Sequence, residues 1–269
     1  MTSIILLNYN AWEDILNEIE IAHNTLGINY NDIIVIDNKS TDDSVLHLQN
    51  KEFVFIESNK NYGYAKGNNI GLRYSYDKGY KYSLILNSDI VIGDKELLNK
   101  LKKVLKNDDL IATVNPDIYS PNEYLYNRDA KRPTFFDLTL GMHRYKAVGR
   151  KIDIIDDYGY VYRPQGCCML VDLKKMNDVD YFDENTFLYN EEIILAERLL
   201  KKGYRCACCV NAKVIHNNSV TIKKSFTKND LIKIKQTGFK YYLIKYRKFN
   251  LAMIKICMFF NYLKLQFLK

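Results

Sequence analysis

The sequence lacks any apolar run of about 18 residues, the length that a membrane-spanning helix requires. Its first apolar run covers only residues 4–7, and no charged leader stands in front of it. We therefore expect a first β-strand there and not a signal peptide. With 269 residues, of which 47% are hydrophobic, the chain can bury a substantial core.

The six cysteines lack the spacing that a zinc site needs. They include two adjacent pairs, at 167–168 and 208–209, and no two pairs are separated as zinc ligands are. Because no export signal is visible, we interpret them as reduced thiols of the core.

Acidic residues are missing from the C-terminal part of the chain. Residues 231–269 hold nine Lys or Arg and no Asp or Glu, whereas the whole chain has a formal charge of +7. Subtracting the nine leaves −2 for residues 1–230. The sequence thus predicts two parts, a nearly neutral globular domain over 1–230 and a basic tail over 231–269.

In the tail, aromatic and aliphatic residues alternate with Lys and Arg. This pattern predicts basic amphipathic helices, which suit the inner face of an anionic membrane. We therefore expect a cytoplasmic protein that is peripheral on the cell membrane. Nucleic acid is not expected as a partner, because no nucleic-acid-binding motif accompanies the charge. Packing of the tail on the body, or on a second subunit in a homo-oligomer, is the alternative.

The body alternates short apolar runs with amphipathic stretches, which predicts an α/β fold with a mainly parallel central sheet flanked by helices. The expected strands lie at residues 3–7, 33–36, 53–56, 82–86, 166–171, 206–210 and 213–215. The expected helices lie at residues 12–26, 95–106 and 191–202, the stretch 61–71 opens another that runs to about residue 76, and a further helix start lies near 40–44. Between them, residues 111–164 hold all four prolines and predict a loop-rich insertion that shapes the acceptor side of a binding site.

Polar residues Asn87, Ser88 and Asp89 follow the buried strand at 82–86. In open α/β sheets, ligands bind at the carboxyl ends of the strands. These side chains therefore suit a hard cation and its phosphate ligands, although a simple turn at the strand end explains Asn and Asp equally well.

Glycines at 63, 67 and 71 fall along one face of the helix that precedes this strand. Their spacing differs from the dinucleotide fingerprint, whose glycines stand closer together. A glycine face lets either a ligand or a packed element approach the helix backbone.

Taken together, these motifs resemble glycosyltransferase family 2 and its GT-A fold, in particular bacterial rhamnosyltransferase-like members that assemble polysaccharides. The stretches that carry the resemblance are residues 7–10, 35–44, 61–71, 86–89, 182–198 and 214–219. The resemblance covers about residues 3 to 220. It implies a Rossmann-like nucleotide-binding half and an acceptor-binding half.

The resemblance also implies the donor site. Asp89 is the metal-binding carboxylate of the family's D-x-D element, His216 is a second ligand, and the metal is Mg²⁺ or Mn²⁺. Asp37 would hydrogen-bond the nucleobase, and Asn87 would contact the ribose or the diphosphate. The full set implied for the nucleotide sugar is Asn8, Asn10, Asp37, Asn38, Gly67, Asn68, Asn87 and Ser88.

An inverting transfer needs a base that takes the proton of the acceptor hydroxyl. In the family this base is the Asp of a Glu-Asp pair, and here the pair is Glu191 and Glu192. Glu192 aligns with the base, and Glu191 is the rival. The longer side chain changes the geometry of proton transfer.

We therefore expect an inverting, metal-dependent glycosyltransferase of cell-surface polysaccharide biosynthesis. It would use a nucleotide-diphosphate sugar and a glycan or lipid-linked acceptor. A sugar-phosphate nucleotidyltransferase is an alternative, but it would need a Gly-rich basic loop where residues 8–10 read Asn-Tyr-Asn. A non-catalytic, membrane-associated protein that binds nucleotide sugars or glycans is the other alternative.

Overall fold

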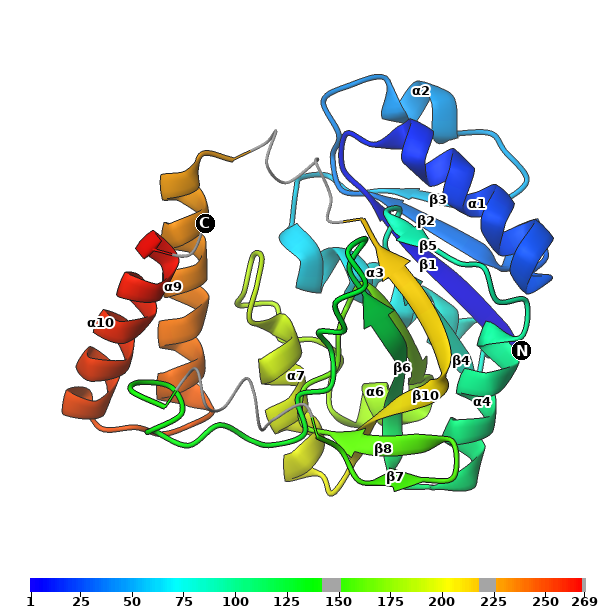
Figure 1. The fold of residues 1–269 in the computed structure, drawn as a ribbon. Helices are drawn as coiled ribbons and strands as arrows, with labels where there is room; N and C mark the ends of the chain where they lie inside the picture. Colours follow the sequence, from blue (N-terminus) through cyan, green and yellow to red (C-terminus); the bar gives the residue numbers. More distant parts are fainter. Residues whose placement is uncertain (142–150, 218–225, 268–269) are drawn as a thin grey trace.

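The computed structural model describes residues 1–141, 151–217 and 226–267 (Figure 1). The last two residues of the motif at 214–219 lie outside this description. The α-helices are α1 (Trp12–Leu26), α2 (Ser44–Leu48), α3 (Gly63–Asp77), α4 (Leu97–Asn107), α6 (Leu173–Asp178), α7 (Glu191–Lys201), α9 (Lys228–Lys245) and α10 (Leu251–Phe267). The strands are β1 (Thr2–Asn8), β2 (Ile33–Asp37), β3 (Val54–Glu57), β4 (Tyr82–Leu86), β5 (Ile90–Val91), β6 (Ile111–Tyr119), β7 (Ile154–Ile155), β8 (Tyr158–Val161), β9 (Cys168–Asp172) and β10 (Arg205–His216).

All described strands belong to one sheet, ordered β3-β2-β1-β4-β9-β6-β10-β8-β7, with β5 paired to β10. The α/β class and the helix-flanked sheet confirm the prediction. The first four strands of this order are parallel, as is β6 with β10. In contrast, β9 runs antiparallel to both β4 and β6, and β8 and β5 run antiparallel to β10. The sheet is therefore mixed, and the predicted parallel order holds for its first half.

Helices cover both faces of the sheet, because each helix has one apolar face to bury. One core layer joins the sheet to α1, α2 and α4, and the opposite layer joins it to α3, α6 and α7. The strand residues are almost fully buried, in keeping with their continuous apolar runs. This arrangement fixes the carboxyl ends of β1, β2 and β4 along one edge.

The glycine face of α3 packs on β1. A Cβ atom on Gly71 would lie 2.8 Å from Cγ2 of Ile5, and one on Gly67 would lie 2.6 Å from Cδ1 of Leu7. Both distances are shorter than a carbon contact allows, so these glycines permit the close approach of helix and strand. Helix packing accounts for Gly67 and Gly71.

The prediction of a loop-rich insertion over residues 111–164 was wrong at its start, and also near its end, where β7 and β8 lie. Residues 111–119 form β6, a nine-residue strand that is buried over most of its length. Polar residues in β6 have partners outside the strand. Asp117 of β6, for example, forms a hydrogen bond and an ion pair with the side chain of Arg128. Pro116 is tolerated because the pairing of β6 with β10 is irregular after Cys209.

The two predicted closing strands are one 12-residue strand, β10, with an irregularity between Cys209 and Lys213. It ends at His216. All six cysteines are buried, and the structure shows each of them as a free thiol.

Helices α9 and α10 lie side by side at one end of the molecule, next to α7 (Figure 1). Helix α9 begins with a capping box in which the side chains of Thr227 and Asp230 each bond the other residue's backbone N–H. Phe239, Tyr242 and Leu243 of α9 pack against Ile194 of α7, so α9 is attached to the body by a core of its own. Within the described residues, no helix is long and apolar enough to cross a membrane.

Candidate active site

A cavity of about 140 Å³ lies where β1 and β4 end. Of the predicted donor-site residues, Asn38, Asn87, Ser88 and Asp89 line it. The complete lining is Leu7, Tyr9, Ala11, Asn38, Asn61, Gly63, Tyr64, Asn87, Ser88, Asp89, Phe187, Leu188 and Phe226. Its volume is below the roughly 300 Å³ at which ordinary ligand pockets begin.

Asp89 and His216 lie next to each other, as the sequence predicted. Because β5 follows Asp89 directly and pairs antiparallel with the end of β10, Ile90 is opposite His216. Nε2 of His216 lies 3.0 Å from Oδ2 of Asp89. Oδ1 of Asp89 is buried and has no hydrogen-bond partner in the described part of the chain. A buried carboxylate oxygen without a partner is a site for a cation or a donor.

The imidazole of His216 is held from its other side by Tyr126, whose hydroxyl oxygen lies 2.5 Å from Nδ1. The Asp89 carboxylate can only accept, so Nε2 carries a proton when it faces Asp89. In the neutral ring, the Tyr126 hydroxyl then donates to Nδ1. Binding of a metal at Nε2 would move the proton to Nδ1, and Tyr126 can accept it there because a hydroxyl plays both roles.

The donor set suits a hard or borderline divalent cation. A carboxylate oxygen without a partner and an imidazole nitrogen are ligands that Mg²⁺ or Mn²⁺ accepts. Over residues 1–141, 151–217 and 226–267, no group of three or more His, Cys, Asp or Glu side chains could hold a metal. Two protein ligands leave most coordination positions to the phosphates of a ligand and to water.

Glu192 stands in the first turn of α7, and its Oε1 accepts a hydrogen bond of 2.6 Å from the backbone N–H of Gly166. Its side chain is partly exposed. Burial raises the pKa of Glu192, and the positive charge of Arg163 and the hydrogen bond from the Gly166 N–H counteract this rise.

Glu191 has a different environment. It is only 6% exposed, and its Oε2 is buried with no hydrogen-bond partner among the described residues. Burial, and then the charge of Glu192, raise the pKa of Glu191 to about 8. Near neutral pH, Glu191 therefore holds a proton more often than an ordinary carboxyl group does, and its burial keeps it from solvent.

Asp37, the predicted nucleobase ligand, is completely buried and does not line the cavity. Its carboxylate accepts hydrogen bonds from Nδ2 of Asn8, at 2.8 Å, and from Oγ of Ser40, at 2.6 Å. The backbone N–H of Ser40 donates to its second oxygen. In this arrangement, Asp37 and Asn8 fix the loop after β2.

The other predicted asparagines also support loops. Asn38 lines the cavity, but its amide bonds Asn61 and the backbone of residues 62 and 63. Asn10 accepts from the backbone N–H of Thr41 at the surface. Asn68 donates to a backbone carbonyl of its own helix, and its Oδ1 is buried without a hydrogen-bond partner in the part that the structure describes. Asn87 and Ser88, like the neighbouring Asp89, combine a place in the cavity with partial exposure.

Three site features were missed from the sequence, namely the hydroxyl of Tyr126, the side chain of Arg163 and the backbone N–H of Gly166. All three come from the region after β6 or the loop before β9. Arg163 forms an ion pair of 2.5 Å with Asp129, and both charges act on Glu192. The sequence around a tyrosine in an irregular segment, or around a residue that contributes only its backbone N–H, does not indicate that the residue belongs to a site.

A further carboxyl group lies behind the site. Glu18 of α1 is fully buried, and neither of its oxygens has a hydrogen-bond partner among the residues described. Burial, and then the charge of Asp89, raise the pKa of Glu18 to about 8. Near neutral pH it is a neutral acid within electrostatic reach of Asp89.

Comparison with known proteins gives two sequence matches. Residues 3–172 match the sequence model of a family described as glycosyl transferase family 2. The low-salt glycan biosynthesis hexosyltransferase Agl10 of Haloferax volcanii is 28% identical over 223 residues, which cover 81% of this chain and 67% of that protein.

Solved structures share the fold. GalNAc-T7, solved with UDP, GalNAc and Mn²⁺, superposes with a TM-score of 0.65 at 12% identity over 92% of this chain. The mannosyltransferase PcManGT of Pyrobaculum calidifontis, solved with GDP-Man and Mn²⁺, gives 0.60 at 13% identity over 99% of this chain and 70% of its own. TarS of S. aureus gives 0.58, also at 13% identity and over 99% of this chain. The chain spans 49% of the GalNAc-T7 chain and 43% of TarS. These likenesses confirm the predicted GT-A fold.

Proposed function

The chain belongs to glycosyl transferase family 2, and from this we propose that it is an inverting, metal-dependent transferase. It moves a sugar from a nucleotide-diphosphate sugar to a glycan or lipid-linked acceptor in cell-surface polysaccharide biosynthesis. The observation that carries the proposal is the Asp89–His216 pair beside a cavity, together with the Glu192 carboxylate that the Gly166 N–H holds at the start of α7. Agl10 supports the substrate class, since its name describes a hexosyltransferase of glycan biosynthesis.

In this proposal, Asp89 and His216 hold Mg²⁺ or Mn²⁺ together with the donor diphosphate. The cation, when bound, offsets the negative charge that develops on the leaving nucleoside diphosphate. Asn87 and Ser88 hydrogen-bond the diphosphate or ribose from the end of β4. Tyr126 keeps the His216 ring in place. The loop-fixing asparagines and Asp37 keep the nucleotide side of the cavity in shape.

Glu192 acts as the general base. It takes the proton from the acceptor hydroxyl while the hydroxyl oxygen attacks the anomeric carbon from the side opposite the diphosphate. The new C–O bond forms as the bond to the diphosphate oxygen breaks, which inverts the anomeric configuration. The Gly166 N–H orients the carboxylate, and Arg163 favours its charged form.

The two alternatives find less support. A nucleotidyltransferase has no use for a base at the start of α7, and the loop after β1 lacks basic residues. A non-catalytic binding protein has no need for the charged environment around Glu192.

We expect donor binding to depend on Asp89. With about a hundredfold excess of nucleotide sugar over its Kd, Mn²⁺ and the donor together should raise the Tm by about 5 °C or more. Asp89→Asn should abolish the part of the shift that needs Mn²⁺, because the metal loses its charged ligand. The measurement is a thermal-shift assay with UDP-glucose, GDP-mannose and dTDP-rhamnose.

The matched control is Asp109→Asn, since Asp109 is an exposed acid remote from the cavity lining. An equal Mn²⁺-dependent shift in the wild type and in Asp89→Asn would contradict the role of Asp89.

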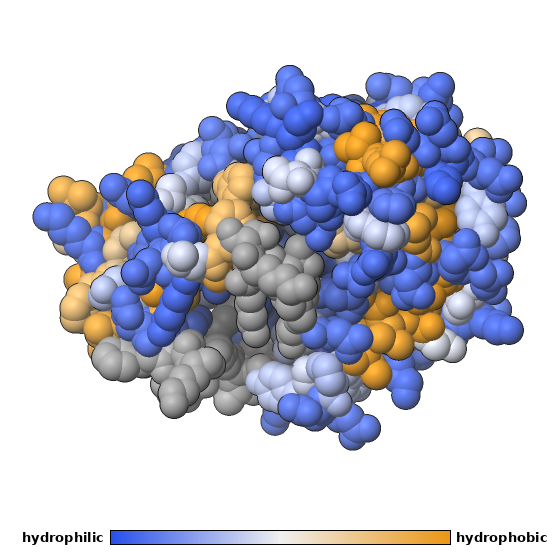
Figure 2. All heavy atoms as spheres, turned by 90° about the horizontal axis from the view of Figure 1, so that it is seen from above, coloured by the Kyte–Doolittle hydropathy of each residue, from blue (hydrophilic) through white to orange (hydrophobic). Residues whose placement is uncertain are grey.

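We further propose that α10 attaches the protein to the inner face of an anionic membrane. Leu251, Ile256, Phe259 and Tyr262 of α10 are each more than two-fifths exposed, and Lys255 and Lys264 lie among them. Figure 2 shows hydrophobic residues interspersed with hydrophilic ones at the end of the molecule formed by the C-terminal helices. Apolar side chains among lysines suit the boundary between acyl chains and anionic headgroups.

Loss of two of these side chains should weaken membrane binding. We expect Ile256→Ser with Phe259→Ser to reduce binding to phosphatidylserine-containing vesicles by about 10-fold or more, as apolar area no longer enters the lipid. Leu46→Ser, which changes a side chain that is 67% exposed on α2, is the control and should bind as the wild type does. Co-sedimentation measures both, and unchanged binding of the double variant would refute the membrane role of α10.

A further inference from the structure

The turn in front of the two glutamates has an unusual backbone. Tyr189 and Asn190 have φ angles of 68° and 69°, so two successive residues other than glycine lie in the left-handed region. Asparagine enters this region more readily than other side chains do, whereas tyrosine seldom does. Such a turn persists only where surrounding contacts hold it.

Helix α9 supplies contacts on one side of the turn. Asn190 occupies the N-cap position of α7 but makes no capping hydrogen bond with its side chain. Instead, Nδ2 of Asn190 donates to the backbone carbonyl of Lys235, at 3.2 Å. Nζ of Lys235 lies 4.3 Å from the centre of the Tyr189 ring, within the range of a cation–π interaction. Both left-handed residues are thus in contact with the same residue of α9.

Gly238 of α9 allows this close approach. A Cβ atom at this position would lie 2.8 Å from Nδ2 of Asn190 and 3.3 Å from the backbone oxygen of Tyr189. Glycine is unfavourable inside a helix because it costs more backbone entropy than alanine. The close contact with the turn explains why a glycine occupies position 238 inside the helix.

Helix α3 holds the start of the same segment. The backbone N–H of Tyr64 donates to the carbonyl of Phe187, at 2.8 Å, and a Cβ on Gly63 would lie only 1.9 Å from that carbonyl oxygen. Residues 187–190 are therefore clamped between α3 and α9, and Glu191 and Glu192 follow without a break.

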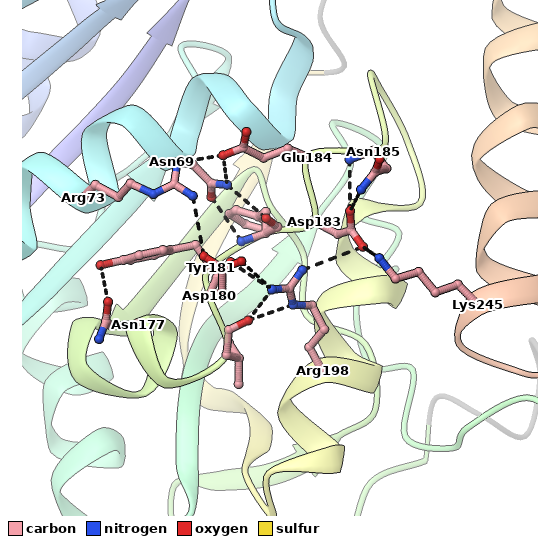
Figure 3. Close-up of polar contacts among 12 residues, drawn as sticks. Asn69, Arg73, Asn177, Asp180, Tyr181, Asp183, Glu184, Asn185, Arg198 and Lys245 are labelled. Carbon is pink, nitrogen blue, oxygen red and sulfur yellow. Dashed lines mark hydrogen bonds and ion pairs between the residues drawn. The ribbon is translucent and has the colours of Figure 1, made fainter.

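The loop that leads to this segment also anchors α9. The carboxylate of Asp183 accepts hydrogen bonds from the Tyr241 hydroxyl, at 2.8 Å, and from Nζ of Lys245, at 3.0 Å. Figure 3 shows the Asp183 carboxylate between Asn185, Arg198 and Lys245, the last of which comes from α9. Two separate contacts thus fix α9 relative to residues 183–192.

We propose that α9 is a positioning element for the transfer reaction, and that Gly238 and Lys235 hold the left-handed turn that aims the Glu192 carboxylate. The inference rests on the proposed base role of Glu192 and adds the C-terminal helix to the acceptor half of the enzyme. Gly238 and Lys235 touch neither substrate nor metal. They act through Tyr189 and Asn190.

The test is Gly238→Ala in the full chain. The added methyl group displaces the Asn190 amide from the Lys235 carbonyl and crowds the Tyr189 carbonyl, so the turn loses its contact with α9. We expect kcat to fall by about 10- to 100-fold, since small misplacements of catalytic groups have effects of this order. The KM for the donor should change less than kcat does, because Tyr189 and Asn190 do not line the donor cavity and only the preceding Phe187 and Leu188 do. Activity is measured as Mn²⁺-dependent release of nucleoside diphosphate from UDP-glucose, GDP-mannose and dTDP-rhamnose.

If the contact of Gly238 with the turn has no effect, the opposite pattern is expected. Glycine-to-alanine changes in a helix interior generally stabilise the helix where the added methyl group has room, so the variant would then melt higher with kcat unchanged. Thr237→Ala, on the exposed side of the same helix, is the matched control and should leave kcat as in the wild type.

A double variant tests the contact itself. Asn190→Gly removes the side chain that the new methyl group would meet but keeps a residue that adopts the left-handed region easily. In this background, Gly238→Ala should reduce kcat by less than about 3-fold further. Equal losses from Gly238→Ala with and without Asn190→Gly would overturn the proposal.

Hydrogen exchange separates this inference from the proposed function. If the wild type turns over no donor, the transferase proposal fails. The proposed contact of α9 with residues 187–190 is still tested, by the hydrogen exchange of the backbone amides of residues 187–192. These amides should exchange faster in Gly238→Ala than in Thr237→Ala and the wild type. Unchanged exchange in this segment would overturn the role of α9.

Discussion

Glu192→Gln should lower kcat by about 100- to 10,000-fold, the range that a lost general base produces. The amide keeps the size of the side chain but cannot take a proton from the acceptor. The KM for the donor should hardly change, because Glu192 is not part of the donor cavity. Steady-state kinetics of sugar transfer, or of donor hydrolysis with water as acceptor, measures the effect.

Glu191→Gln is the matched control, since it makes the same change one residue earlier. We expect a loss of less than about 10-fold, because Glu191 is only 6% exposed and its Oε2 is buried, whereas Glu192 is partly exposed and can meet an acceptor hydroxyl. In the wild type, kcat/KM should rise with pH as Glu192 loses its proton, with a midpoint above the ordinary value of 4.5 because burial raises this pKa. Larger losses in Glu191→Gln than in Glu192→Gln would reverse the assignment.

Glu18→Leu should stabilise the protein by about 3 kcal/mol or more at alkaline pH. The folded-state pKa of Glu18 is about 8, above the ordinary value of 4.5, so the folded protein retains a proton that the unfolded chain loses. Stability in the wild type therefore falls as pH rises from about 5 to about 8. Leucine removes this titration and suits the apolar face of α1, which includes Ile15 and Ile19.

Urea unfolding at several pH values measures this difference. The gain from Glu18→Leu should shrink towards acidic pH, where the wild-type carboxyl is neutral in both states. Glu13→Gln, an exposed acid on the same helix, is the control and should stay within about 0.5 kcal/mol of the wild type. A gain that does not vary between about pH 5 and pH 8 would show that Glu18 does not titrate as proposed.

The first half of the fold was predictable because its signals are local. The limits of α1 and β4 agree with the sequence to the residue, since each is a periodic or continuous apolar stretch bounded by polar or glycine residues. The apposition of Asp89 and His216 was also predicted, and it follows from the pairing of β5 with the end of β10.

Strand β6 could not be predicted, because its stability depends on distant partners. Asn115 receives a hydrogen bond from the backbone N–H of Gln165 and donates to the carbonyls of Gln165 and Cys168. These contacts satisfy the polar side chain of Asn115 inside a buried strand. The sequence near residue 115 gives no indication of them, because the partners lie about 50 residues further along the chain. The predicted boundary at residue 230 stays a prediction, although α9 begins at Lys228 and packs on α7.

The site shows the same division between local and distant signals. The sequence predicted which polar residues lie at the strand ends, but not which of them support loops and which face the cavity. Asp37 and Asn8 satisfy each other, which a motif does not reveal, whereas Asn87 and Ser88 remain accessible in the cavity. The contacts of α9 with Tyr189 and Asn190 join positions about 45 residues apart and depend on a backbone conformation that neither residue type predicts.

The most direct test of the central claim is the anomeric configuration of the first-formed product, read by ¹H NMR before mutarotation. The wild type is incubated with Mn²⁺ and the nucleotide sugar that gives the largest thermal shift. We predict that donor is consumed and that the sugar first appears with the anomeric configuration opposite to that of the donor, at a rate that Glu192→Gln lowers. A first-formed sugar with the configuration of the donor, or no consumption of any donor, would contradict the account.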